Sequence, residues 1–241
     1  MSNENREHAE TEVPAAHRDD VFIVIAAYNE ATCIEEVARE VSASYPNVVV
    51  VDDGSSDETF AAAQRGARFV LRHLVNRGQG AALQTGIEFA LKRGAQFVVT
   101  FDADGQHRVE DVARLLEPII AGECDIALGS RFLGEAPNMP ATRRLVLKCG
   151  VLFTRIVNRV NLTDAHNGLR AFSRDAASHV RITADRMAHA SEMIDFVRDS
   201  GLPYREIPVE IRYTEYSMAK GQSSGNAIRI VLQYLLGKIF E

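Results

Sequence analysis

Residues 21–57 read VFIVIAAYNEATCIEEVAREVSASYPNVVVVDDGSSD, and this stretch decides the fold class. It opens with an apolar run and closes with a second one that ends in two aspartates. Unbroken runs of β-branched residues are typical of strands buried on both faces. The acidic, amphipathic segment between them, from about Thr32 to Ser44, predicts a helix. Strand, loop, helix and strand in this order predict a mostly parallel α/β sheet flanked by helices.

The same alternation continues to residue 131. We expect further helices and strands there at about 58–65, 68–71, 79–93, 97–101, 109–121 and 125–129. Beyond that point the pattern predicts two apolar helices, a strand and a terminal helix, at 143–160, 188–200, 205–212 and the C-terminus, with a loop over 161–172. Residues 1–20 carry many charges and no apolar run, so we expect a flexible polar tail before one domain, 21–241.

Composition and charge exclude several classes of protein. The chain has 27 Lys+Arg against 33 Asp+Glu, a formal charge of −6, whereas binding to a nucleic-acid backbone calls for a basic patch. The 3 cysteines are odd in number and not at metal-ligand spacing, which favours a reducing cytoplasm over a disulfide framework or a structural zinc site. No apolar run reaches the ~18 residues that span a bilayer. We therefore expect a cytoplasmic protein, with peripheral membrane attachment left open.

Three of the predicted strands end in polar or acidic residues. These ends are YNE at 28–30, DDGSSD at 52–57 and DADGQH at 102–107. Ligands of open α/β sheets bind at the carboxyl ends of the strands, so these residues are candidates for a site. Asp57 is explained by helix capping alone. Asp102 and Asp104 are not, because carboxylates two residues apart repel unless a cation neutralises them, and Mg²⁺ takes one or two carboxylates plus phosphate oxygens.

Five motifs follow one another between residues 26 and 131: AAYNE, VVDDGSSDET, NRGQGAALQTGI, FDADGQH and LGSR. With TDAHNGLRAFSR and EIPVEIRYTEYSMAKGQSS downstream, they resemble the inverting family 2 glycosyltransferases of GT-A fold, especially the dolichol-phosphate mannose synthase-like, polyprenyl-phosphate branch. The resemblance implies a Rossmann-like fold with a donor half, 21–131, and an acceptor half, 132–241. It implies transfer of a sugar from a UDP- or GDP-linked donor to a polyprenyl phosphate or lipid-linked saccharide, with Mg²⁺ or Mn²⁺.

The resemblance also assigns roles to individual residues. The nucleoside and donor would contact Ala26, Tyr28, Glu30, Val51, Asp53 and Ala103. The metal would be held by Asp102 and Asp104, with Gln106 as a further ligand. Arg131 would lie near the diphosphate or the sugar, and Arg212 and Lys220 would lie in a basic loop that closes on the diphosphate. The spacing of these last two residues departs from the family pattern.

The catalytic residues needed on the acceptor side depend on the chemistry of the acceptor. An alcohol needs a general base. The candidates for this base are Asp164 first, Glu192 second and His166 third. On the donor side, Asp104 is the candidate catalytic residue. A phosphate acceptor is already anionic and needs no base. In that case Asp164 orients a loop, and a structural Asx-turn explains it equally well. For His107 we expect either a supporting role beside the metal or a place at the start of a helix, and Arg170 is either structural or a partner of an acceptor phosphate.

Two other classes of protein stay open. A sugar-nucleotide nucleotidyltransferase would also use a nucleotide and a metal, but it needs a glycine-rich basic turn that AAYNEAT lacks. A non-catalytic sugar-nucleotide-binding protein would not need the full set of charged residues. The apolar helix 143–160 and the terminal helix have basic flanks, which suits a membrane surface, a protein core or a dimer interface. The donor base, the acceptor and the oligomeric state stay undecided.

Overall fold

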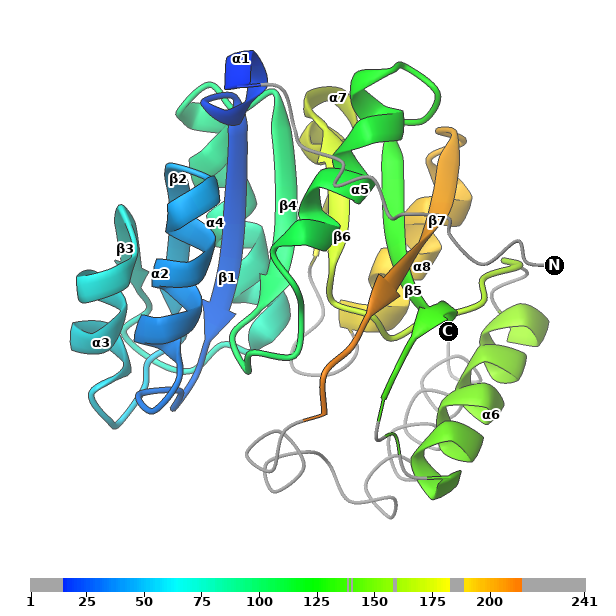
Figure 1. Ribbon diagram of the computed structural model, residues 1–241, viewed down its shortest axis with the longest axis horizontal. Helices are drawn as coiled ribbons and strands as arrows, with labels where there is room; N and C mark the ends of the chain where they lie inside the picture. Colours follow the sequence, from blue (N-terminus) through cyan, green and yellow to red (C-terminus); the bar gives the residue numbers. More distant parts are fainter. Residues whose placement is uncertain (1–14, 138, 140, 158–159, 183–188, 214–241) are drawn as a thin grey trace, which may run out of the picture.

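The computed structural model describes residues 15–137, 139, 141–157, 160–182 and 189–213. Its described residues form one seven-stranded sheet in the order β3-β2-β1-β4-β6-β5-β7 (Figure 1). The strands are β1 (Val21–Ala27), β2 (Asn47–Asp52), β3 (Phe69–Arg72), β4 (Phe97–Asp102), β5 (Ile126–Glu135), β6 (Arg170–Ser173) and β7 (Tyr204–Glu210). The helices are α1 (Ala15–Arg18), α2 (Ile34–Ser44), α3 (Thr59–Gly66), α4 (Gln79–Lys92), α5 (Glu110–Ile120), α6 (Ala141–Val157), α7 (Arg174–His179) and α8 (His189–Asp199).

Helices cover both faces of the sheet, as the continuous apolar strands predict. One buried cluster joins the sheet to α2, α3 and α5, and the other joins it to α4, α7 and α8. Every residue of β2 is buried, which explains why this strand lacks the apolar–polar alternation of a strand with one wet face. The prediction of a mostly parallel α/β sheet flanked by helices is confirmed.

The register of the central strands positions the site. β1 pairs in parallel with β2 on one side and with β4 on the other, and Ala26 is the partner of Asp102. β2 and β4 therefore lie on opposite sides of β1, and the point where the strand order reverses is the topological switch point of the sheet. In open α/β folds, ligands usually bind in the crevice beyond the carboxyl ends of the strands at this point.

Several elements differ from the prediction. The expected loop 161–172 contains the start of β6, which runs antiparallel between β4 and β5. This strand has only four residues and owes its conformation to its two neighbours, so no local pattern reveals it. β5 continues beyond Arg131 to Glu135 instead of ending there.

The predicted polar tail is also too long. Residues 15–18 form the short helix α1, and the Asp20 carbonyl accepts hydrogen bonds from the amides of Gln96 and Phe97. The Asp19 carbonyl accepts one from the Asn47 side chain at 2.7 Å. Residues 15–20 thus pack against the amino ends of the strands. Residues 1–14, the segment 214–241 where we expected a terminal helix, and Lys220 within it lie outside the described residues.

Within the part of the chain that the structure describes, no helix combines the length and the hydropathy needed to cross a membrane.

Candidate active site

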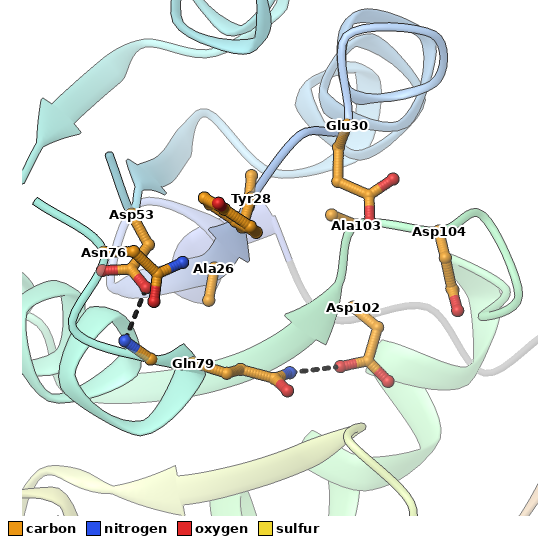
Figure 2. A pocket seen from close by; sticks show the side chains of 11 residues that line it. Ala26, Tyr28, Glu30, Asp53, Asn76, Gln79, Asp102, Ala103 and Asp104 are labelled. Carbon is orange, nitrogen blue, oxygen red and sulfur yellow. Dashed lines mark hydrogen bonds between the residues drawn. The ribbon is translucent and has the colours of Figure 1, made fainter. Parts of the chain in front are cut away.

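A cavity of about 390 Å³ opens at the carboxyl ends of β1 and β4. Figure 2 shows its lining, which comes from the ends of these two strands, from the turn after β2 and from the start of α4. The lining residues are Ala26, Ala27, Tyr28, Glu30, Asp53, Asn76, Gly78, Gln79, Asp102, Ala103 and Asp104. Seven of the expected donor and metal residues therefore meet in one place: Ala26, Tyr28, Glu30, Asp53, Asp102, Ala103 and Asp104. Val51 does not, because its side chain is fully buried in the core.

Asp53 organises the loop that precedes α4. Its carboxylate accepts hydrogen bonds from the amides of Arg77 (3.0 Å) and Gly78 (2.7 Å) and lies 2.7 Å from Nδ1 of His73. Gly78 has a φ of +93°, a conformation that favours glycine and turns the chain into the helix. The carboxylate thus fixes the loop 73–78, which brings Asn76 and Gly78 to the cavity. His73 and Asn76 were not predicted as site residues, although NRGQG marks the turn itself.

Asp102 ends β4 and faces the cavity. Its Oδ1 accepts a hydrogen bond from Nε2 of Gln79 at 3.3 Å (Figure 2), and its Oδ2 lies 2.9 Å from Nε2 of His107. Burial opposes ionisation, but the hydrogen bond and charge of His107 and the charges of Arg170 and Arg131 outweigh it, so the pKa of Asp102 is lowered. His107 is itself buried and holds the Asp102 carboxylate from the protein side.

The pKa of Asp104 shifts in the opposite direction to that of Asp102. Burial and the charge of Asp102 raise its pKa to about 6. Two carboxylates of one cavity, one of them destabilised by the other, fit a divalent cation, since the cation removes their repulsion. No cluster of three or more His, Cys, Asp or Glu side chains suited to a metal exists among the described residues. A metal held by Asp102 and Asp104 would have room for phosphate oxygens and water among its other ligands.

Gln106 and Arg212 meet through their main chains. The Gln106 carbonyl accepts a hydrogen bond from the Arg212 amide at 2.9 Å, and the Gln106 amide donates to Oδ1 of Asp104 at 3.1 Å. Neither side chain lines the cavity. The Arg212 side chain is half exposed and lies 3.9 Å from a Glu210 oxygen. The structure thus links the loop after β7 to the loop after β4, without placing either side chain at the cavity.

Arg131 and Asp164 form a buried ion pair away from the cavity lining. Nε of Arg131 donates to Oδ2 of Asp164 at 2.6 Å, and the Arg131 amide donates to the same oxygen at 3.1 Å. The side chains are 7% and 1% exposed, and the guanidinium also donates to the Tyr213 hydroxyl. Oδ1 of Asp164 accepts from the His166 amide at 3.2 Å, which is the Asx-turn that the sequence left open. This geometry supports neither Arg131 at the diphosphate nor Asp164 as general base.

Glu206 of β7 holds the Asp164 loop in place. Its carboxylate accepts hydrogen bonds from the Thr163 amide (2.8 Å), the Thr163 hydroxyl (2.8 Å) and the Asp164 amide (3.2 Å). Thr163 also lies 2.6 Å from the Ser130 hydroxyl of β5. Glu206 was not predicted as a site residue. An acidic residue inside the apolar run EIPVEI was the available signal.

The other two acceptor-side candidates lie apart from the ion pair. Glu192 is half-buried near the start of α8. His166 follows the Asx-turn and lies under α6, where a side chain added at Gly150 would come within 2.9 Å of its ring. His166 is exposed to solvent on one side, and the protein atoms around its ring, together with the charges of Arg131 and Arg170 and against that of Asp164, lower its pKa. Neither lines the cavity.

The family description Glycosyl transferase family 2 matches residues 22–181. The chain belongs to this family. The GT-A fold and the transferase activity expected from the motifs are thereby confirmed.

Two relatives of this glycosyltransferase match along nearly their whole lengths. The UDP-N-acetylglucosamine–dolichyl-phosphate N-acetylglucosaminyltransferase of Methanococcus voltae is 33% identical over 247 residues, which cover 92% of this chain and 98% of the relative. The polyprenol monophosphomannose synthase of Mycolicibacterium smegmatis is 32% identical over 237 residues, which cover 93% and 89%.

A solved structure shares the fold. The complex of glucosyl-3-phosphoglycerate synthase from Mycobacterium tuberculosis with Mn²⁺, UDP and glucosyl-3-phosphoglycerate superposes with a TM-score of 0.71, covering 98% of this chain and 86% of that chain. The two sequences are 19% identical, so the likeness concerns the fold alone.

Proposed function

We propose that this glycosyltransferase moves a sugar from a nucleotide-diphosphate donor to the phosphate of a polyprenyl phosphate, with inversion at the sugar carbon. The observation that carries the donor half is the pair Asp102 and Asp104, which faces a cavity large enough for a nucleotide at the switch point of the sheet. Both relatives described above are named for transfer to a polyprenol-type or dolichyl phosphate, which supports the acceptor.

The chain's own residues would bind and orient the donor. Tyr28 is 45% exposed at the cavity and offers a flat ring to the nucleoside. Asp53 holds the loop whose Asn76 and Gly78 border the same space. Asp102 and Asp104 would hold Mg²⁺ or Mn²⁺. Such an ion, when bound, neutralises the charge that develops on the diphosphate as the sugar leaves.

A phosphate acceptor agrees with the state of Asp164. Both oxygens of this carboxylate are engaged, Oδ2 by Arg131 and Oδ1 by the His166 amide. Asp164 is therefore not free to take a proton from an acceptor hydroxyl. An anionic phosphate oxygen attacks without losing a proton, so the reaction needs no base there. An acceptor hydroxyl on a lipid-linked saccharide would require one, and the exposed imidazole of His166, two residues after Asp164, is then the candidate.

Helix α6 suits a lipid surface. It stands off the sheet at the edge where the arrowheads of β1 and β7 point (Figure 1). Leu145 and Leu152 are 65% and 59% exposed on it, and the side chains of Arg144 and Lys148 are exposed as well. An apolar surface with cationic flanks lies well in a headgroup layer. We propose a peripheral position at the cytoplasmic face of the membrane, with α6 bringing the acceptor phosphate to the cavity.

A transfer assay tests the proposal. The protein is incubated with UDP- or GDP-linked hexoses and a short polyprenyl phosphate, with Mn²⁺, Mg²⁺ or EDTA, and the lipid phase is analysed for glycosylated product by mass spectrometry. We expect metal-dependent product with one nucleotide class. Asp104→Asn should abolish it, and Asp175→Asn, which removes an exposed carboxylate on α7, should not. Product formed in EDTA, or sugar found only on hydroxyl acceptors, would contradict the proposal.

A further inference from the structure

Arg170, the first residue of β6, is a buried cation with no direct counterion. Its side chain belongs to a residue that is 5% exposed. Among the residues that the structure describes, its guanidinium takes part in no hydrogen bond or ion pair; the charges of Asp102 and Asp164 act on it from farther away. Burial accordingly lowers its pKa. A buried charge without a bonded partner costs folding free energy, so its presence calls for a functional reason.

The position of Arg170 points to the metal site. Its strand neighbours are Thr100 of β4 and Leu128 of β5. Asp102 lies two residues beyond Thr100 and therefore projects from the same face of the sheet. Gly168, two residues before Arg170, is so close to the Asp102 carboxylate that a side chain at position 168 would overlap it. The guanidinium is thus held near the Asp102 carboxylate without bonding to it.

A small void accommodates the charge. Arg170, Asn167 and Asp164 line a cavity of about 10 Å³, and Nδ2 of Asn167 is buried there with no hydrogen-bond partner. This is about the space that one water molecule needs. A water there can solvate the guanidinium, while no protein oxygen neutralises it. The positive charge stays effective at Asp102.

The charges of the site can be counted. Asp102 and Asp104 contribute two negative charges, and Arg131 and Asp164 cancel one another as an ion pair. Glu30 and Asp53 add two further carboxylates to the lining of the same cavity. Arg170 opposes these negative charges from beside Asp102. With a cation beside Asp102, a free divalent ion is bound more weakly than it would be without Arg170. A nucleotide diphosphate supplies the missing negative charge together with phosphate oxygens.

We propose that Arg170 is a positioning residue that, through Asp102, holds down the affinity of the site for a free divalent ion, so that tight metal binding requires the diphosphate of the donor. The inference rests on the proposed function, since it takes Asp102 and Asp104 as the metal ligands. Its consequence is that the metal and the nucleotide enter and leave together. Release of the product is then not hindered by a metal ion that stays behind on the protein.

The test is a titration with Mn²⁺ followed by electron paramagnetic resonance, without nucleotide and then with UDP or GDP. Arg170→Met removes the charge at similar size, Arg170→Lys keeps it, and Arg205→Met is the matched control. Arg205 lies on β7 and pairs with exposed Glu123 far from the cavity. We expect Arg170→Met to bind free Mn²⁺ roughly tenfold more tightly and to lose most of the coupling between Mn²⁺ and the nucleotide. Arg170→Lys and Arg205→Met should resemble the wild type.

A purely structural role predicts the reverse, because damage to the site weakens metal binding. Unchanged or weaker binding of free Mn²⁺ by Arg170→Met, or a lysine variant that behaves like the methionine variant, would overturn the inference. Arg170→Met should also unfold at the wild-type temperature or above it, because an uncompensated buried charge is removed. A variant that fails to fold would equally overturn it. If the wild type binds no Mn²⁺ with either nucleotide, the proposed function itself fails.

Discussion

Asp164→Asn should destabilise the protein strongly and leave donor binding intact. The substitution removes one charge of an ion pair whose side chains are 7% and 1% exposed, and leaves the Arg131 guanidinium buried with a neutral partner. Removal of one partner from a buried pair costs about 3–5 kcal/mol. Asparagine keeps the shape and one acceptor oxygen, so we expect the lower end, about 3 kcal/mol. At about 2–4 °C per kcal/mol for a chain of this size, Tm falls by roughly 6–12 °C.

The assay is thermal unfolding by circular dichroism, combined with calorimetric binding of the donor below the transition. Arg131→Met and the double variant complete a cycle, in which we expect a coupling energy of about 2 kcal/mol, because the second substitution removes a charge already without its partner. Donor affinity should change less than about threefold, since neither residue lines the cavity. A loss of stability below about 1 kcal/mol, or a donor affinity that falls tenfold at unchanged Tm, would refute the reasoning.

Three further predictions concern the neighbourhood of the site. Gly168→Ala should weaken Mn²⁺-dependent donor binding at least tenfold, since the new methyl group overlaps the Asp102 carboxylate. Gly94→Ala meets no atom within 4 Å but strains a backbone φ of +96°, so it should lower Tm and still keep full binding in the same titration. Glu206→Gln should lower Tm by several degrees and kcat more than the donor KM, because the charged acceptor of three hydrogen bonds at Thr163 and Asp164 is lost; equal stability would contradict this. Leu145→Ser with Leu152→Ser should reduce sedimentation with anionic vesicles several-fold and spare turnover of a water-soluble acceptor; unchanged sedimentation would argue for a dimer or core role of α6.

The donor side of the site was predictable because its residues follow strands. Tyr28, Asp53 and Asp102 come directly after the apolar runs that form β1, β2 and β4. In a parallel sheet the carboxyl ends of strands share one edge, so residues distant in sequence meet there without further information. Asp104 follows from its spacing to Asp102.

The acceptor side was not predictable in the same way. Its contacts join residues from strands that do not run in chain order: Arg131 of β5 reaches Asp164, and Glu206 of β7 reaches Thr163. These contacts depend on β6, a four-residue antiparallel strand between β4 and β5. Its sequence, RAFS, carries no periodicity that distinguishes a strand from a loop. We expected separate roles for Arg131 and Asp164, whereas in the structure the two charged side chains form one buried ion pair.

By itself, the sequence determined the fold class, the family and the place of the two carboxylates, because buried parallel strands leave a continuous apolar pattern and their ends share one edge. Only the tertiary structure decided which charges neutralise one another. Ion pairing depends on distances of a few ångströms between side chains far apart in the chain, and on burial from water, and neither is written in local spacing. Thus Asp164 is engaged by Arg131, whereas Arg170 remains a buried cation beside Asp102.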